Sequence, residues 1–196
     1  GGEYRSSILA VNKREVRVRV AEHYASECES PLDITLALGI SAGERMEYSL
    51  QKATELGVTA IQPLAMERSV VKLAAERAEK RQQHWQHVVI AACEQCGRNR
   101  IPVVAPVQKL YAYLAAVDRN KRLLMLSPQA DTPLKRIAPA QAAVLLIGAE
   151  GGFAPAEYQA AQSSGFEPVS LGPRILRTET APVAALALLQ ALWGDL

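Results

Sequence analysis

The residue types best suited to chemistry gather in two segments near the C-terminus, and the first is a glycine-rich turn. Residues 145–152 read Leu-Leu-Ile-Gly-Ala-Glu-Gly-Gly, an apolar run that leads into glycines and one carboxylate. Glycine lets a backbone bend sharply and come close to a ligand, and α/β folds bind ligands at the C-terminal ends of their strands. The segment has neither the P-loop nor the dinucleotide-binding pattern. It indicates either a ligand-binding turn or a tight connection between a strand and a helix.

The second segment, residues 171–181, reads Leu-Gly-Pro-Arg-Ile-Leu-Arg-Thr-Glu-Thr-Ala and leads into an apolar helix. It places Arg174, Arg177 and Glu179 between a predicted buried strand and that helix, where charges are costly unless they are paired. Thr178 or Thr180 is expected to cap the helix, but a cap does not account for the charges. The arginines are therefore either surface residues or charges that need partners, and this segment alone does not decide between the two.

A third pattern resembles a metal site but has the wrong geometry. His84, His87, Cys93 and Cys96 have the types and spacing of zinc ligands. All four lie in one predicted helix, and at about 100° per residue the histidines and the cysteines point to opposite sides of it. One tetrahedral ion cannot be reached from both sides of a helix, so we predict no metal. Cys96, on the same face as Trp85, is expected to be a small core residue.

Size and composition are those of an ordinary globular protein. The chain has 196 residues, of which 49% are hydrophobic, enough for one α/β domain with a core. Its apolar runs are too short to span a bilayer, so no membrane is expected. Three cysteines without framework spacing favour a reducing compartment, and we predict a cytoplasmic location. The net charge of +2 identifies no partner, although basic residues cluster in places where they would meet either phosphates or only solvent.

Alternating strand and helix patterns predict the fold class from residue 33 onward. Ser41 and Glu44 have the spacing of a capping box, and Gly57 is expected to close the same helix in the left-handed conformation. Strands that alternate with helices favour an α/β fold with a mainly parallel sheet and helices on both faces. The predicted strands are 33–40, 58–64, 101–105, 122–126, 143–148 and 167–171, and the clearest helices are 41–57, 73–96, 155–165 and 180–193.

Residues 1–30 predict a separate unit. Residues 7–9 and 15–20 read as two short strands around a turn, and the second alternates valines with charged residues. A hairpin of this size cannot bury a core alone. We therefore expect it to be the last part of a small β-domain.

Together, the two C-terminal segments resemble the signature of a known family. The pair Gly-x-Glu-Gly-Gly at 148–152 and Leu-Gly-Pro-Arg-Ile-Leu-Arg-Thr-Glu-Thr-Ala at 171–181 is similar to that of the RsmE family, the 16S rRNA uridine-N3 methyltransferases of the SPOUT superfamily. Residues 44–57, 67–72 and 91–100 also resemble this family. The likeness covers the chain from residue 31 onward, with several specific motifs in the expected order.

The resemblance implies a fold and an assembly. Members of the family have a deep C-terminal trefoil knot, act as homodimers and carry an N-terminal β-barrel domain that resembles PUA domains. Residues 1–30 would be the C-terminal strands of a truncated PUA-like RNA-binding domain, and residues 31–196 the SPOUT methyltransferase domain. The cofactor would be S-adenosyl-L-methionine, and the partner would be 16S rRNA in the small ribosomal subunit.

The resemblance also implies a cofactor pocket formed by the loops of the knot. Backbone groups at Leu146, Gly148, Gly151, Leu171 and Leu176 are expected to hold the cofactor. The residues carried over as cofactor-binding are Leu126, Ser127, Leu146, Ile147, Gly148, Ala149, Glu150, Gly151, Leu171, Gly172, Ile175, Leu176, Arg177 and Thr178.

Methylation of uridine N3 sets the remaining roles, because the base must be unpaired and its N3 proton must leave. Arg174 and Arg177 would bind RNA phosphate or stabilise the developing uridine anion. Glu150 or Glu179 would orient the target or accept the proton, although each also fits a structural ion pair. The rival hypothesis is a non-catalytic RNA-binding or ribosome-assembly protein of the same fold. The expected RNA contacts are Arg68, Lys72, Arg98 and Arg100.

Three residues depart from the family pattern. Ala149 stands where proline is usual, Ala154 where a capping residue such as serine is common, and Pro182 where a small helix-former is usual. Alanine is a poor cap, whereas proline is tolerated in the first turn of a helix. None of the three removes a group that could do chemistry.

Overall fold

A parallel sheet runs through the chain from residue 33 onward. The computed structural model describes residues 1–70 and 75–196. Within this part, every neighbouring strand pair of the sheet is parallel, in the order β5-β4-β3-β8-β7-β9 with β6 beside the far end of β4. The strands are β3 (Asp33–Gly39), β4 (Ala60–Ala65), β5 (Val103–Val104), β6 (Gln108–Lys109), β7 (Arg122–Leu126), β8 (Ala142–Ile147) and β9 (Glu167–Val169).

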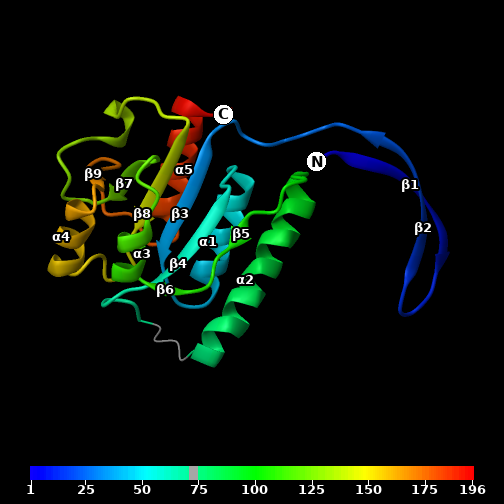
Figure 1. Cartoon of the computed structure of the whole chain (residues 1–196), viewed down its shortest axis with the longest axis horizontal. Coiled ribbons are helices and arrows are strands. Elements are labelled where there is room, and N and C mark those ends of the chain that lie inside the picture. The colour runs from blue at the N-terminus through cyan, green and yellow to red at the C-terminus, as the bar shows by residue number, and fades with distance from the viewer. Residues whose placement is uncertain (71–74) are drawn as a thin grey trace.

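Helices cover both faces of this sheet, as Figure 1 shows. One face carries α1, α2 and α5, which pack around a core that includes Leu50, Trp85 and Leu186. The other face carries α3 and α4, over a second core that includes Leu114 and Ala161. The helices are α1 (Glu44–Glu55), α2 (Ala75–Cys96), α3 (Leu110–Ala116), the single 3₁₀ turn η1 (Leu134–Arg136), α4 (Pro155–Ser163) and α5 (Thr180–Trp193).

The central strands are apolar throughout because both of their faces are covered. In β8, Leu145 and Ile147 belong to the core under α1, α2 and α5. Their neighbours Val144 and Leu146 belong to the core under α3 and α4. Successive side chains of a strand point to opposite faces, so one continuous apolar run fills both cores. The predicted α/β class with a mainly parallel sheet is confirmed.

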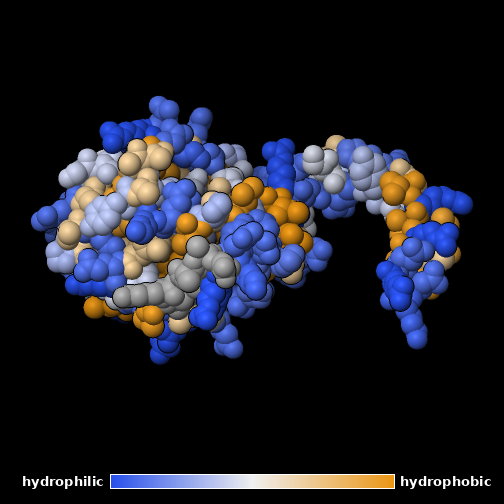
Figure 2. Space-filling model, turned by 60° about the horizontal axis from the view of Figure 1, so that its bottom comes forward, coloured by the Kyte–Doolittle hydropathy of each residue, from blue (hydrophilic) through white to orange (hydrophobic). Residues whose placement is uncertain are grey.

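The N-terminal hairpin is a separate piece of structure. Strands β1 (Glu3–Val11) and β2 (Val16–Tyr24) pair antiparallel and stand away from the main body on an extended connection (Figure 1). Their apolar side chains are exposed, and Figure 2 shows them as a separate hydrophobic patch on the hairpin. Ile8 is 68% exposed. The hairpin is longer than the sequence predicts, and it has no core of its own.

Several local expectations can now be checked. Gly57 has a φ of 78° and closes α1 in the left-handed conformation, as predicted. The capping box was wrong: α1 begins after Gly43 without a side-chain cap, and the Ser41 hydroxyl faces the sulfur of Met46 instead. The core cysteine of α2 was also misassigned. Cys93 is buried at 3% exposure, while Cys96 is only half-buried.

Candidate functional site

A cavity of about 310 Å³ opens where β7, β8 and β9 end, at the edge of the sheet where parallel α/β folds bind ligands. Its size is typical of small-molecule sites. Three loops surround it, one after each of these strands, and the loop after β4 adds a fourth side. The lining residues are Arg68, Leu126, Ser127, Pro128, Gln129, Ile147, Gly148, Ala149, Glu150, Gly151, Gly152, Phe153, Tyr158, Leu171, Gly172, Arg174, Ile175, Leu176, Thr178 and Ala181.

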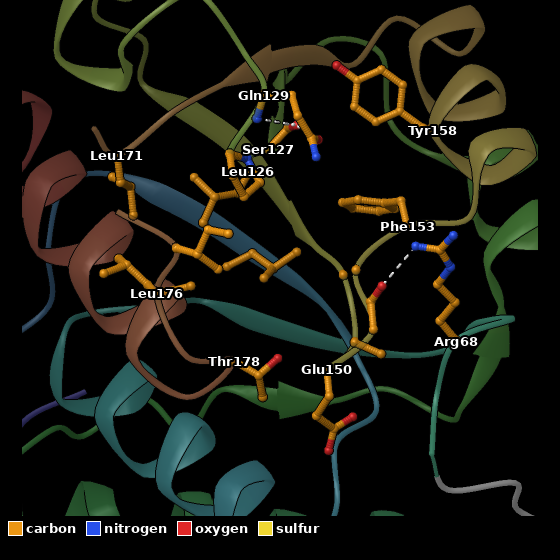
Figure 3. Close-up of a pocket in the computed structure, with 18 of the residues that line it drawn as sticks. Arg68, Leu126, Ser127, Gln129, Glu150, Phe153, Tyr158, Leu171, Leu176 and Thr178 are labelled. Carbon is orange, nitrogen blue, oxygen red and sulfur yellow. Dashed lines mark hydrogen bonds between the residues drawn. The ribbon is translucent and has the colours of Figure 1, made fainter. Parts of the chain in front are cut away.

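One side of the cavity is aliphatic. Leu126, Leu171 and Leu176 converge from two loops, on the left of Figure 3. Ile175 also lines the cavity and is 85% exposed, an unusual state for a large apolar side chain. Apolar walls with a few polar groups are typical of pockets that bind cofactors.

The glycine-rich turn forms the floor of the cavity between β8 and α4. The turn is closed by the Gly152 N–H, which donates to the Ala149 carbonyl at 2.8 Å. The end of β3 passes directly beneath it: a Cβ added at Gly39 would lie 2.4 Å from the Ala149 nitrogen. Only a glycine lets the two backbones approach this closely. The turn is therefore held by packing from below as well as by its own hydrogen bond.

Glu150 is the acidic group of this floor. Its Oε1 accepts a hydrogen bond from the Ala42 N–H at 2.7 Å, just before α1. Its Oε2 is buried and has no hydrogen-bond partner among the described residues. A buried carboxylate oxygen without a partner is costly, and this one belongs to a residue that lines the cavity. The arrangement can accept a hydrogen bond or a proton from a bound molecule.

The side opposite the aliphatic wall is cationic and aromatic. The Arg68 guanidinium donates to the Gly151 carbonyl at 3.1 Å, which brings the loop after β4 against the glycine-rich turn (Figure 3). Phe153 and Tyr158 meet edge to face, with ring centroids 6.5 Å apart. These two aromatic residues were not anticipated, because a lone aromatic beside a turn or in a helix usually packs in a core. We call Arg68, Phe153 and Tyr158 the aromatic wall.

Most residues predicted to bind the cofactor lie around this one cavity, and two do not. Leu146 is fully buried inside β8, between Ala37 of β3 and Met125 of β7, so strand pairing occupies its backbone. Arg177 does not line the cavity, and its carbonyl accepts the first N–H groups of α5. Two lining residues, Arg68 and Arg174, were predicted for other roles. The lining residues that appear in none of the predicted sets are Pro128, Gln129, Gly152, Phe153, Tyr158 and Ala181.

The candidate catalytic residues are divided in the same way. Glu150 and Arg174 line the cavity. Glu179 does not, because it lies at the residue that precedes α5, beyond the lining segment. The roles themselves stay predictions.

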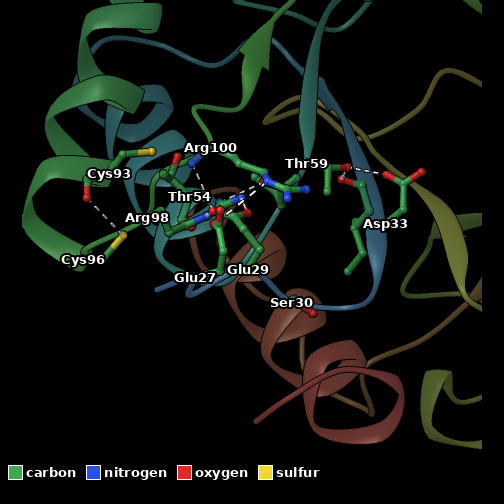
Figure 4. A network of polar contacts seen from close by, with 12 residues as sticks. Glu27, Glu29, Ser30, Asp33, Thr54, Thr59, Cys93, Cys96, Arg98 and Arg100 are labelled. Carbon is green, nitrogen blue, oxygen red and sulfur yellow. Dashed lines mark hydrogen bonds and ion pairs between the residues drawn. The ribbon is translucent and has the colours of Figure 1, made fainter. Parts of the chain in front are cut away.

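The expected RNA contact at Arg98 needs correction. Its side chain is 4% exposed, and its guanidinium hydrogen-bonds both carboxylate oxygens of Glu29 and the carbonyls of Thr54 and Val58 (Figure 4). Four of its five N–H donors are used inside the protein and its side chain is almost fully buried, so it is poorly placed to contact a phosphate. Burial opposes ionisation of Glu29, but the hydrogen bond and charge of Arg98 outweigh it and lower the pKa of that carboxyl.

The other expected RNA contacts lie at the surface or outside the described residues. Arg68 is exposed at the cavity, and Arg100 is exposed beside Glu27. Lys72 lies outside the described residues. Within residues 1–70 and 75–196, no group of three or more histidine, cysteine, aspartate or glutamate side chains could hold a metal ion. Over the same residues, no helix combines the length and apolar character needed to cross a membrane.

Known proteins resemble this chain over nearly its whole length. The family of RNA methyltransferase domains matches residues 28–190. A ribosomal RNA small subunit methyltransferase E from Buchnera aphidicola is 38% identical over 192 residues, which cover 97% of this chain and 78% of that protein.

Solved structures agree with the sequence comparison. A ribosomal RNA small subunit methyltransferase E from Neisseria gonorrhoeae, bound to S-adenosyl methionine, matches with a TM-score of 0.93 and 43% identity. A Legionella pneumophila protein in complex with the same cofactor matches with a TM-score of 0.94 and 43% identity. Each match covers 100% of this chain and 81% of the other.

Proposed function

Because this chain belongs to the RsmE family of RNA methyltransferases, we propose that it transfers the methyl group of S-adenosyl-L-methionine to N3 of one uridine in small-subunit ribosomal RNA. The relatives it matches carry that ribosomal name, and two matching structures hold the cofactor. The observation that carries the proposal within this chain is the buried Oε2 of Glu150 at the floor of the cavity, which has no hydrogen-bond partner within residues 1–70 and 75–196. This oxygen could accept a hydrogen bond or a proton from a substrate.

The cavity fits the cofactor in size and chemistry. The aliphatic side would take the adenine, with Leu126, Leu171 and Leu176 against its faces. The glycine-rich turn would allow the rest of the molecule to lie against backbone. When bound, S-adenosyl-L-methionine supplies a methyl group on a sulfonium, which needs mainly to be held in line with the nucleophile.

The protein must then manage the proton on uridine N3. This nitrogen lies on the Watson–Crick edge, so the base has to be unpaired to reach the cavity. We assign Glu150 rather than Glu179 to accept this proton or orient the base, because only Glu150 lines the cavity. Its Oε1 stays on the Ala42 amide while its Oε2 is available to the base.

The arginines would act on charge. Arg174 lines the cavity and is exposed, so it is placed to stabilise the uridine anion as the proton leaves. Arg177 is exposed outside the cavity and would bind a neighbouring phosphate. Because Arg174 lies at the cavity and Arg177 lies outside it, substitution of each arginine alone can distinguish the two roles.

The test is methyl transfer to unmodified small ribosomal subunits by Glu150→Gln. Loss of a proton acceptor is expected to lower the rate by about 100-fold, while the affinity for the cofactor in calorimetry changes little. Glu167→Gln is the matched control, since Glu167 pairs with Arg122 at the opposite edge of the sheet and should leave the rate unchanged. Cofactor binding without turnover in the unsubstituted protein would instead favour the rival, a non-catalytic RNA-binding or assembly protein. Mass mapping of the product gives the modified atom.

We also propose that the C-terminal segment is knotted. After β9, Ser170 exchanges backbone hydrogen bonds with Thr132 and Leu134 of the connection between β7 and β8, and α5 then packs against η1 of that connection. Both observations support a chain that passes through the β7–β8 connection. An experimental structure traced through residues 126–193 decides the point.

Assembly and the N-terminal unit complete the proposal. We propose a homodimer through α5, in which Leu192 is 44% exposed; sedimentation of the protein tests it.

The hairpin β1–β2 would belong to a PUA-like RNA-binding unit over residues 1–30, beside the methyltransferase domain of residues 31–196. A protein that acts on ribosomal subunits would work in the cytoplasm.

A further inference from the structure

Glu157, in the first turn of α4, is a buried carboxylate that the proposed reaction does not use. It is 2% exposed, and both of its oxygens are occupied. Oε1 accepts the Glu67 N–H at 2.8 Å, and Oε2 accepts the Ala154 N–H at 2.9 Å. The second bond is one half of a capping box, in which the residue at the third helical position accepts the N–H of the residue before the helix; Ala154 has no side-chain acceptor for the other half. The bond from the Glu67 N–H does not stabilise α4 itself, because Glu67 lies 90 residues away in the chain and outside the helix.

What these bonds hold is the aromatic wall of the cavity. Glu67 is followed by Arg68, Ala154 is preceded by Phe153, and Glu157 itself is followed by Tyr158. Each group that Glu157 holds is therefore the immediate neighbour of one wall residue. Glu157 does not line the cavity, so any effect it has on a ligand must pass through these neighbours.

A second contact fixes the same wall from the other side. Arg68 donates to the Gly151 carbonyl, and a Cβ added at Gly151 would lie 2.7 Å from the Cβ of Arg68. The loop after β4 is thus packed on the glycine-rich turn at one point and tied to α4 at another. These two anchors restrict how far the wall can move relative to the glycine-rich turn and α4.

The chemistry of the wall suits a nucleotide. A guanidinium binds phosphate, and aromatic rings stack on an unpaired base. The aliphatic side has neither a cation to bind phosphate nor an aromatic ring to stack on a base. The aromatic wall is therefore the better fit for the RNA, and the aliphatic side the better fit for the cofactor. We propose that Glu157 is a positioning residue that holds Arg68, Phe153 and Tyr158 in place for the target nucleotide. This inference rests on the proposed function and names the side of the site that receives RNA.

The experiment compares Glu157→Gln with the unsubstituted protein by three measurements. They are the affinity for transcribed small-subunit rRNA by fluorescence anisotropy, the affinity for S-adenosyl-L-methionine by calorimetry, and amide exchange at Glu67 and Ala154. A glutamine keeps one acceptor and turns an N–H₂ toward the other amide, so one charged hydrogen bond is lost. We expect about tenfold weaker RNA binding, faster exchange at one of the two amides, and cofactor affinity within about twofold.

Arg68→Ala and the double variant distinguish positioning from a general loss of structure. If Glu157 acts through the wall, the effects of Arg68→Ala and Glu157→Gln on RNA affinity should be less than additive in the double variant, because part of the Glu157 effect passes through Arg68. Fully additive effects would mean that Glu157 does not act through Arg68. Glu157→Asp keeps the charge but is one methylene too short to reach both amides, and serves if the glutamine variant does not fold. Glu167→Gln, with its exposed ion pair, is the matched control.

Two results would overturn the inference. One is unchanged RNA affinity in Glu157→Gln or Glu157→Asp; the other is a loss of cofactor affinity equal to the loss of RNA affinity, which marks a structural cap only. The measurements of RNA affinity and of cofactor affinity do not require the protein to transfer a methyl group. A parallel assay of the unsubstituted protein that shows cofactor binding but no methyl transfer would refute the proposed function, while the binding comparison would still decide the role of Glu157.

Discussion

Arg98 and Glu150 are both charged residues withdrawn from solvent, and their surroundings differ. Arg98 makes four hydrogen bonds, to both oxygens of Glu29 and to two backbone carbonyls, and joins the linker before β3 to the end of α1. In the described part of the chain, Glu150 makes one, to the Ala42 N–H, and its second oxygen is buried beside a cavity without a hydrogen-bond partner there.

The difference separates a charge that serves the fold from one that is open to a ligand. A buried charge is tolerated when its hydrogen-bonding groups are satisfied, and Arg98 meets that condition inside the protein. Glu150 meets it only when another molecule provides the missing donor. Substitution of the first should therefore lower stability, and substitution of the second should lower activity.

The largest effect is expected for Arg98→Met, which leaves Glu29 as a mostly buried, unpaired carboxylate. Breaking a buried ion pair from one side costs about 3–5 kcal/mol in the free energy of unfolding, measurable by urea denaturation. The double variant with Glu29→Gln should recover part of the loss, since the unpaired charge is then gone. A stability loss below about 1 kcal/mol would mean that the pair behaves like a surface salt bridge and that the contrast with Glu150 is false.

Gly39→Ala is expected to disturb the turn that carries Glu150 without touching any charge. Its Cβ would lie within van der Waals overlap of the Ala149 nitrogen and the Gly148 carbonyl carbon. Overpacking of this kind costs about 1–3 kcal/mol, and relief by movement of the turn should also weaken cofactor binding in calorimetry. Unchanged stability together with unchanged affinity would show that the turn is not held from below.

Acid should weaken the ion pair between Arg98 and Glu29 and so lower the stability of the protein. The pKa of Glu29 is lowered from its usual 4.5, because its contacts with Arg98 outweigh the cost of burial. The unfolded chain binds this proton at a higher pH than the folded one does. The stabilisation is therefore complete above about pH 4.5 and is lost as the pH falls through the lower folded-state pKa. Urea denaturation at pH 7 and pH 3.5 should show a larger loss for the unsubstituted protein than for Glu29→Gln.

A second carboxyl group with a lowered pKa, that of Asp33, does not affect the comparison between the unsubstituted protein and Glu29→Gln. Burial opposes ionisation of Asp33 as well, and hydrogen bonds from Lys121 and Thr59 outweigh it, so its pKa also lies below its usual value. Its contribution has the same sign and is common to both proteins. Equal acid sensitivity of the two proteins would remove Glu29 as the cause.

The smallest change in stability is expected for Glu150→Gln. The amide oxygen can still accept the Ala42 N–H, and the amide no longer leaves a charged oxygen unpaired. The free energy of unfolding should stay within about 0.5 kcal/mol of the original or rise, while methyl transfer falls. A loss as large as that of Arg98→Met would place Glu150 with the structural charges.

The sequence was sufficient for the class of fold, and it singled out the segments that surround the cavity. Apolar runs separated by helical patterns predict the parallel sheet, and 122–126 and 180–193 match β7 and α5 at both ends. Most of the residues in the two segments that carry the resemblance, 148–152 and 171–181, line the cavity, and such a turn can be seen in the sequence because it is contiguous in the chain and its glycines are visible there. Family membership follows from the same segments.

The tertiary structure alone decided which charges are satisfied. Arg98 and Arg68 look alike in the sequence, but only the fold brings Glu29 to one and leaves the other at the cavity. Phe153 and Tyr158 became wall residues only when α4 met the loop after β4, through the bond from Glu67 to Glu157. Partners that lie 69 and 90 residues apart leave no periodic pattern. Local patterns determine strands, helices and turns, whereas the hydrogen-bonding environment of a side chain depends on which distant segments pack against it.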